Sequence, residues 1–106
     1  MADIMDFYIR NYSSPDRDAV LRICELGPLP LNIPLDSLRG ARKFVAACGD
    51  EIIGFGAIDV QIACTACAHA TVLALCAENE DAAKALRDSL EGYAKSCWVS
   101  VIRNRL

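Results

Sequence analysis

Apolar and polar residues repeat along this chain with two periods, that of a strand and that of a helix. The first segment, Phe7–Asn11, is short and rich in aromatic and β-branched residues, which predicts a strand. The next residues are typical of a helix start. Ser13 can cap the helix, Pro15 stands where a backbone N–H would need no hydrogen bond, and the charge of Asp16 suits the helix dipole. The predicted helix ends at Gly27. Its apolar face has helical spacing and consists of Ala19, Val20, Ile23 and Cys24.

The middle of the chain predicts a short helix and then three paired strands. After an apolar loop interrupted by prolines, we expect the helix over about Leu35–Arg42. Lys43–Cys48 and Glu51–Gln61 predict a hairpin around the turn Gly49–Asp50. A third strand, Ala68–Cys76, is predicted to pair back on the second.

Glycine occurs twice within the second arm of this hairpin, at Gly54 and Gly56. Residues two apart in a strand share one face of the sheet. Glycine inside a strand usually marks a bulge or the close approach of another backbone or of a ligand. We therefore expect something to lie directly against this face.

The last part of the chain predicts an amphipathic helix over Glu80–Ser96 and a strand over Trp98–Ile102. The predicted buried face of the helix consists of Ala83, Leu86, Leu90, Tyr93 and Cys97. Its predicted solvent face consists of Lys84, Arg87, Asp88, Glu91 and Lys95. The order of elements is β-α-α-β-β-β-α-β, which indicates an α+β fold, and 106 residues suit a single domain over residues 1–106.

Composition changes this picture mainly by exclusion. The formal net charge is −3 with 11 Lys and Arg residues, so the chain lacks the basic stripe that nucleic acid binding needs. The longest uncharged stretch, Val60–Ala77, is too polar for a membrane span. The first six residues carry acids, whereas a signal peptide begins with bases and an apolar core. We therefore expect a cytoplasmic protein that binds neither nucleic acid nor membrane.

Six cysteines in 106 residues are a high count. Most stand among apolar residues, where a free thiol packs as a small hydrophobic group. Cys64 and Cys67 have the C-x-x-C spacing of metal and redox sites, and His69 follows two residues later. A structural zinc ion needs four ligands, and no glycine bends the chain here. A structural role is favoured and no metal is expected, while a metal or redox site at Cys64, Cys67 and His69 stays as an alternative.

Four passages together resemble the GNAT superfamily of N-acetyltransferases. Tyr8–Ala19 is similar to the family's first strand and helix start, and Lys43–Ala57 resembles its second hairpin. Val72–Cys76 resembles its fourth strand, and Ala82–Ile102 looks like the helix and strand that follow. The passages occur in the family's order over most of the chain. The resemblance implies a GNAT-like, mixed but mostly antiparallel sheet flanked by helices, which lacks the family's last helix and closing hairpin.

The resemblance also implies an activity, the transfer of an acetyl group from acetyl-CoA to an amine. In the family, the fourth strand pairs with the pantetheine arm and the start of the next helix binds the pyrophosphate. These roles fall on Leu75, Cys76, Ala77, Ala82, Ala83 and Lys84. The candidates for the group that takes the proton of the amine are Asp59, Glu78 and His69. For His69, a single histidine near a hairpin tip, a surface or partner contact is the favoured role.

The phosphate-binding passage departs from the family pattern. The family uses Q/R-x-x-G-x-G/A, because glycines let backbone N–H groups approach the phosphates. This chain has Glu78 in place of Arg or Gln and Asp81 in place of the first glycine. At roughly 4–6 Å and an effective dielectric of about 20, each carboxylate–phosphate pair costs on the order of 3 kcal/mol before screening. These carboxylates therefore oppose the binding of acetyl-CoA.

A catalytically silent module that forms a homodimer is the alternative to an enzyme. Trp98–Ile102 would form an apolar sheet edge, which a monomer rarely leaves exposed. A second copy of the chain is its simplest partner, and the mean hydropathy of +0.25 also indicates a buried interface. The sequence leaves three functions open: an N-acyltransferase, a homodimerising binding or regulatory module, and a cysteine-based metal or redox module.

Overall fold

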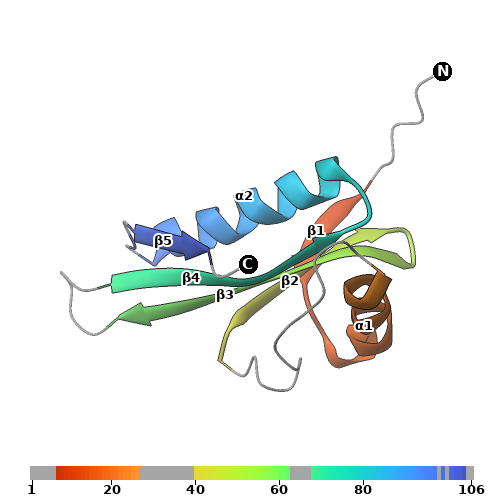
Figure 1. Cartoon of the computed structure of the whole chain (residues 1–106), viewed down its shortest axis with the longest axis horizontal. Coiled ribbons are helices and arrows are strands. Elements are labelled where there is room, and N and C mark those ends of the chain that lie inside the picture. The colour runs from red at the N-terminus through yellow and green to blue at the C-terminus, as the bar shows by residue number, and fades with distance from the viewer. Residues whose placement is uncertain (1–6, 27–39, 63–67, 98, 100, 105–106) are drawn as a thin grey trace.

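The structure is a computed structural model that describes residues 7–26, 40–62, 68–97, 99 and 101–104. These residues form a five-stranded sheet with one helix on each face (Figure 1). The strands are β1 (Tyr8–Asn11), β2 (Arg42–Cys48), β3 (Glu51–Ile62), β4 (Ala68–Ala77) and β5 (Val101–Asn104). A short 3₁₀ turn, η1 (Ser14–Asp16), leads into α1 (Arg17–Leu26), and α2 (Glu80–Ser96) follows β4.

The strands lie in the sheet in their chain order, β1-β2-β3-β4-β5. The first three pairings are antiparallel, and β5 runs parallel to β4. The predicted α+β fold with a mixed, mostly antiparallel sheet is confirmed. So is the hairpin of β2 and β3, whose turn places Gly49 at a φ of +62°, a conformation that glycine adopts readily.

Two predicted boundaries are wrong. No helix reaches Arg42, because Gly40 has a φ of +83° and Arg42 already begins β2. Residues 35–39 of that predicted helix lie outside the described residues. The last strand begins at Val101, three residues after the predicted start, and ends at Asn104, two residues after the predicted end; residues 98 and 100 of the predicted strand lie outside the described residues. The pairing of Val101 with His69 on β4 fixes where β5 begins. The alternation of residues along one strand does not tell which residue of the neighbouring strand each of them pairs with.

Helix α1 covers one face of the sheet near the closed end of the β2–β3 hairpin (Figure 1). Val20, Ile23 and Cys24 are its buried residues. They pack against a cluster on the sheet that consists of Val45, Ala47, Ile52, Phe55, Ala57, Ala74 and Cys76. Residues that face α1 are two apart on each strand, as the alternation of a pleated strand requires, except that a bulge on β3 places Ile52 and Phe55 three apart.

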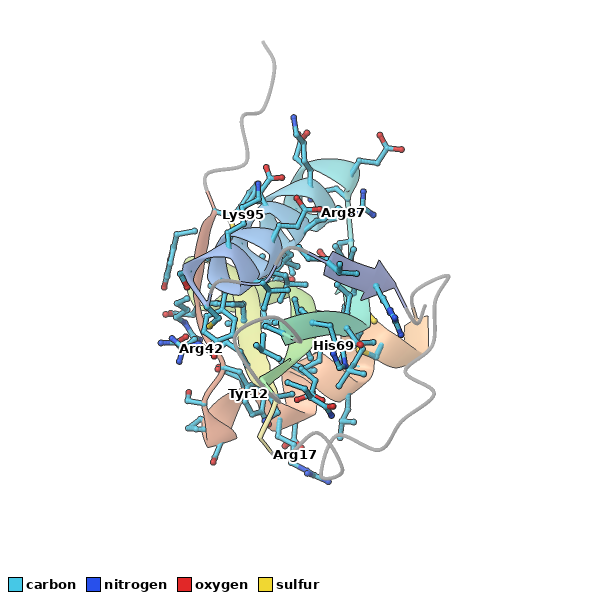
Figure 2. The ribbon with its side chains drawn as sticks, turned by 90° about the vertical axis from the view of Figure 1, so that its left-hand side faces the viewer. Tyr12, Arg17, Arg42, His69, Arg87 and Lys95 are labelled. Carbon is cyan, nitrogen blue, oxygen red and sulfur yellow. The ribbon has the colours of Figure 1, made fainter. Side chains whose placement is uncertain are left out.

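Helix α2 covers the opposite face and spans residues 80–96, as predicted. Leu86 and Leu90 are buried as predicted. Ala82 and Ala94 complete the buried face, whereas the predicted Ala83, Tyr93 and Cys97 are only partly buried. Arg87 and Lys95 are exposed as predicted and point away from the sheet (Figure 2). None of the described helices combines the length and the apolar character needed to cross a bilayer.

Gly54 and Gly56 explain how closely α2 approaches the sheet. A Cβ atom at Gly54 would lie 2.8 Å from Cδ1 of Leu86, and one at Gly56 would lie 3.2 Å from Cδ1 of Leu90. Carbon atoms in ordinary contact lie about 3.5–4.0 Å apart. The close neighbours expected from the two glycines are therefore Leu86 and Leu90 of α2.

A buried carboxylate joins β1 to the start of α1. The guanidinium of Arg10 donates to both oxygens of Asp16, at 2.7 and 2.8 Å, and the backbone N–H of Ser13 donates to the same carboxylate at 2.9 Å. The hydrogen bonds from Arg10 and Ser13 lower the pKa of Asp16 to about 2, although its burial acts in the opposite direction. This bidentate pair sets the direction in which the chain leaves the sheet.

Candidate functional site

β5 leaves β4 partway along its length, and the edge of β4 beyond that point is the candidate site. The two strands pair from His69↔Val101 to Val72↔Asn104. β4 then continues to Ala77 and stays paired with β3 on its other side. Over Leu73–Ala77, no described strand pairs with the β5 side of β4. With no described strand on that side, an extended ligand could lie along β4 there as a further strand would. We call this segment the open edge.

A β-bulge marks the start of the open edge. Ala57↔Ala74 and Ile58↔Val72 are consecutive pairs, so Leu73 is an extra residue on β4. Beyond the bulge, Cys76 packs under α1 and Leu75 packs under α2. Because these side chains are buried in the core, the backbone is the part of this segment that a ligand can contact.

The open edge leads directly into the start of α2. The backbone N–H of Glu78 donates to the carbonyl of Ile53 at 2.9 Å, which ends the pairing with β3. The side chain of Asn79 then accepts a hydrogen bond from the N–H of Ala82 at 2.8 Å and caps the helix. One of the free N–H groups of the helix start is thus already satisfied. Three exposed carboxylates surround it: Glu78, Glu80 and Asp81.

Cys76 of the open edge meets Cys24 of α1 in the core. Both are free thiols and nearly fully buried. Their shared hydrogen bond raises the pKa of Cys24 and lowers that of Cys76, and burial acts to raise both. Both thiols lie in the core cluster under α1, where a thiol packs as a small hydrophobic group. The pair therefore serves as packing between α1 and β4.

Solved structures share this arrangement of strands and helices. A GNAT family acetyltransferase from Staphylococcus aureus has a TM-score of 0.74 at 14% identity, over 96% of this chain and 87% of that one. An acetyltransferase from Trypanosoma brucei has a TM-score of 0.75 at 15% identity, over 95% and 83%. A transcriptional regulator from Bacillus halodurans has a TM-score of 0.77 at 15% identity, over 95% and 82%. This chain has the GNAT fold.

The likeness to the GNAT proteins is one of fold. No family model and no curated protein matches the sequence. Within the GNAT fold, the six residues predicted to contact acetyl-CoA fall into two adjoining groups. Leu75, Cys76 and Ala77 end the open edge, and Ala82, Ala83 and Lys84 lie in the first turns of α2.

A second group of polar residues lies on the sheet face opposite α2, at the end that β5 joins. The residues that pack under α2 there are Ile58, Val60, Ala70, Val72 and Ile102. Their neighbours along each strand point the other way, and the polar ones are Asp59, Gln61, His69, Thr71 and Arg103. Figure 2 shows His69 on the side of the sheet away from α2. We call this group the open polar face.

Two of the three predicted proton acceptors lie together on the open polar face. Asp59 pairs with Thr71, and Gln61 pairs with His69, so Asp59 and His69 are diagonal neighbours on adjacent strands. The amide of Gln61 donates to Asp59 Oδ2 at 3.2 Å and orients the carboxylate. Glu78, the third candidate, follows the opposite end of β4 and is not brought near this pair.

Sequence reasoning missed Thr71 and Arg103. Thr71 lies in an apolar strand, and Arg103 lies in what reads as a basic tail. In the structure, Thr71 pairs with Asp59 on one side and with Arg103 on the other. The alternation of His69 and Thr71 with small apolar residues was the available signal, whereas the pairing with β5 is set by tertiary structure.

The metal alternative is not tested by the described residues. Cys64 and Cys67 lie outside them. Among the residues that are described, no group of three or more His, Cys, Asp and Glu side chains converges on one point. The described ligand candidate, His69, lies on the open polar face.

Proposed function

We propose that this chain is an N-acyltransferase domain that transfers an acetyl group from acetyl-CoA to an amine. The observation that carries the proposal is the open edge, Leu73–Ala77, beside the start of α2 in a GNAT fold. An unpaired strand edge binds an extended chain of amides through its N–H and C=O groups. The pantetheine arm of acetyl-CoA is such a chain, so the backbone of the open edge would hold it.

The open polar face would supply the groups that act on the amine. Asp59 pairs with Thr71, two residues before the bulge at Leu73. If backbone N–H groups at the bulge held the thioester carbonyl, the acetyl group would lie close to Asp59. Bound acetyl-CoA supplies the activated acetyl group. Asp59 would accept the proton that the amine loses as its nitrogen bonds to the acetyl carbon, and the departing sulfur would take a proton from solvent.

The start of α2 does not fit a pyrophosphate well. It carries Glu78, Glu80 and Asp81, all exposed, and its Asn79 cap occupies one N–H group. Repulsion from these carboxylates is reduced by solvent and salt but not removed. We therefore expect acetyl-CoA to bind more weakly than it would if only the contacts of its pantetheine arm determined the affinity.

Calorimetric titration with acetyl-CoA at low salt tests the proposal. Binding at micromolar to submillimolar concentrations supports it. The double variant Glu78→Gln/Asp81→Gly is expected to bind about tenfold more tightly, because two repulsive charges are removed. The matched control, Asp18→Asn/Asp88→Asn, removes two exposed carboxylates elsewhere and should leave the affinity unchanged. No binding by any of these proteins at millimolar acetyl-CoA would refute an acetyl-CoA-dependent enzyme.

The outer edge of β5 favours a second function, a catalytically silent homodimerising module with a binding or regulatory role. Val101 on this strand is 49% exposed, and the described residues place no strand beyond β5. Two copies related by a two-fold axis would pair their β5 edges and cover this residue. Light scattering should then report a dimer that Val101→Lys converts to a monomer. A monomeric parent protein would rule this function out.

Both functions suit the cytoplasm, where we propose that the protein works. This compartment supplies acetyl-CoA and keeps thiols reduced. The described cysteines, which are Cys24, Cys48, Cys76 and Cys97, are free thiols, which supports this location.

A further inference from the structure

The open polar face carries opposite charges on either side of one threonine. Thr71 on β4 pairs with Asp59 on β3 and with Arg103 on β5. Neighbouring strands lie about 4.8 Å apart, so the backbones of Asp59 and Arg103 are roughly 10 Å apart across β4. The ion pair found among the described residues joins Arg10 and Asp16, and none joins Asp59 to Arg103. The two charges thus stand apart on one face, with the short Thr71 side chain between them.

This row of three residues lies where β5 leaves β4. Val72↔Asn104 is the last pair of the two strands, and Leu73 is the bulge that begins the open edge. Helix α1 packs on the same face farther along the sheet, over Ala57 and Ala74. Asp59 and Thr71 are half-buried, and Arg103 is exposed. A molecule bound over the row would therefore lie next to the proposed acetyl donor.

We propose that the acceptor is a primary amine that also carries a carboxylate a few bonds away, and that Arg103 binds this carboxylate while Asp59 receives the amine. This inference rests on the acyltransferase function proposed above and names the class of its acceptor. The planar guanidinium of arginine matches a carboxylate with two parallel hydrogen bonds. The Asp59 carboxylate, held by Gln61, attracts the ammonium form of the amine. That ammonium loses one proton to solvent before it reacts, and Asp59 takes the second proton as the nitrogen bonds to the acetyl carbon.

The charges on this face also argue against two other acceptor classes. A molecule with two or more amines and no anionic group would place a second positive charge against Arg103. A doubly charged phosphate would bring two negative charges toward Asp59, whereas a carboxylate brings one. A zwitterion whose two charges are opposite to those of Asp59 and Arg103 complements both.

Binding of small zwitterions, measured without acetyl-CoA, tests the inference separately from turnover. The probes are glycine, phenylalanine and glutamate, each compared with its α-amide, which keeps the amine but lacks the α-carboxylate. In titrations followed by backbone ¹H–¹⁵N spectra, at least one free acid should shift the signals of Thr71 and Arg103. Its amide should bind at least tenfold more weakly, the usual effect of losing a hydrogen bond to a charged group.

Variants assign this preference to Arg103. Arg103→Gln should bind the free acid and its amide with nearly equal affinity, and Arg103→Lys should recover part of the preference for the acid. The control Arg87→Gln removes an exposed arginine from α2, on the other side of the sheet, and should keep the full ratio. The inference is overturned if no probe shifts these signals, if acid and amide bind equally to the parent protein, or if Arg103→Gln keeps the preference. Failure of acetyl-CoA to bind in the calorimetric experiment would instead remove the proposed enzyme.

Discussion

Replacing Gly54 with alanine tests the packing of α2 on the sheet. The added Cβ would lie 2.8 Å from Cδ1 of Leu86, 3.2 Å from the carbonyl oxygen of Cys76 and 3.3 Å from Cβ of Ala77. Leu86 is fully buried, so its methyl group has little space into which to move, and the carbonyl belongs to the paired backbone of β4. Both neighbours therefore resist the substitution.

The expected cost follows from two opposing effects. Overpacking a core of this density typically costs about 1–3 kcal/mol. Alanine also loses less backbone entropy on folding than glycine, and this difference stabilises the folded variant by roughly 0.5–1 kcal/mol. The free energy of unfolding of Gly54→Ala should therefore fall by about 1–2 kcal/mol. For a domain near this size, each kcal/mol lowers the Tm by roughly 4–8 °C.

Thermal and urea unfolding measure this effect against a matched control on α2. Gly92 is exposed in that helix, with no atom within 4 Å of an added Cβ, so Gly92→Ala should stabilise the protein by up to about 1 kcal/mol. In a Leu86→Ala background the main obstacle is gone, and Gly54→Ala should cost roughly half as much or less. An unchanged or raised Tm for Gly54→Ala, or the same cost in both backgrounds, would refute this account of the glycine.

Two further predictions concern the ends of the helices. Asp16→Asn should destabilise the protein by about 1–2 kcal/mol at neutral pH, because it breaks the buried pair with Arg10. Since folding lowers the pKa of Asp16 from 3.8 to about 2, its contribution is complete above about pH 4 and is lost as the pH falls toward 2. Urea unfolding between pH 2 and pH 7 should show the difference between parent and variant shrinking with acid, and a constant difference would contradict it. Asn79→Ala should cost about 1 kcal/mol through loss of the α2 cap, whereas Asn79→Ser should retain most of it. Equal stability of these two Asn79 variants would show that the cap contributes nothing.

Most of the fold was predictable because its elements have strong local signals. The start of α2 at Glu80 follows from its amphipathic spacing and the acidic residues in the first turn, and the β2–β3 hairpin follows from its glycine turn. The errors occurred where local signals were weak. The helix predicted to reach Arg42 followed a proline-interrupted loop and had no amphipathic repeat to fix its end, and the apolar run before Val101 did not indicate where β5 would pair.

The candidate site was predictable only in part. The sequence offered Asp59 and His69 as candidates for the same role, but nothing in their spacing shows that they share a face. The β3–β4 register makes them neighbours. Arg103 lies on the same face because the parallel pairing of β5 with β4 places it beside Thr71. Such contacts join residues that are distant in the chain, so no local pattern encodes them.

The amino-acid sequence by itself determined the two amphipathic helices, the glycine turn of the hairpin and the acidic start of α2, because capping, turn formation and periodicity act between residues close in the chain. Tertiary structure alone decided where β5 leaves β4, and with it the open edge at Leu73–Ala77 and the polar row of Asp59, Thr71 and Arg103. The physical reason is that strand register is selected by burial of whole faces against α1 and α2.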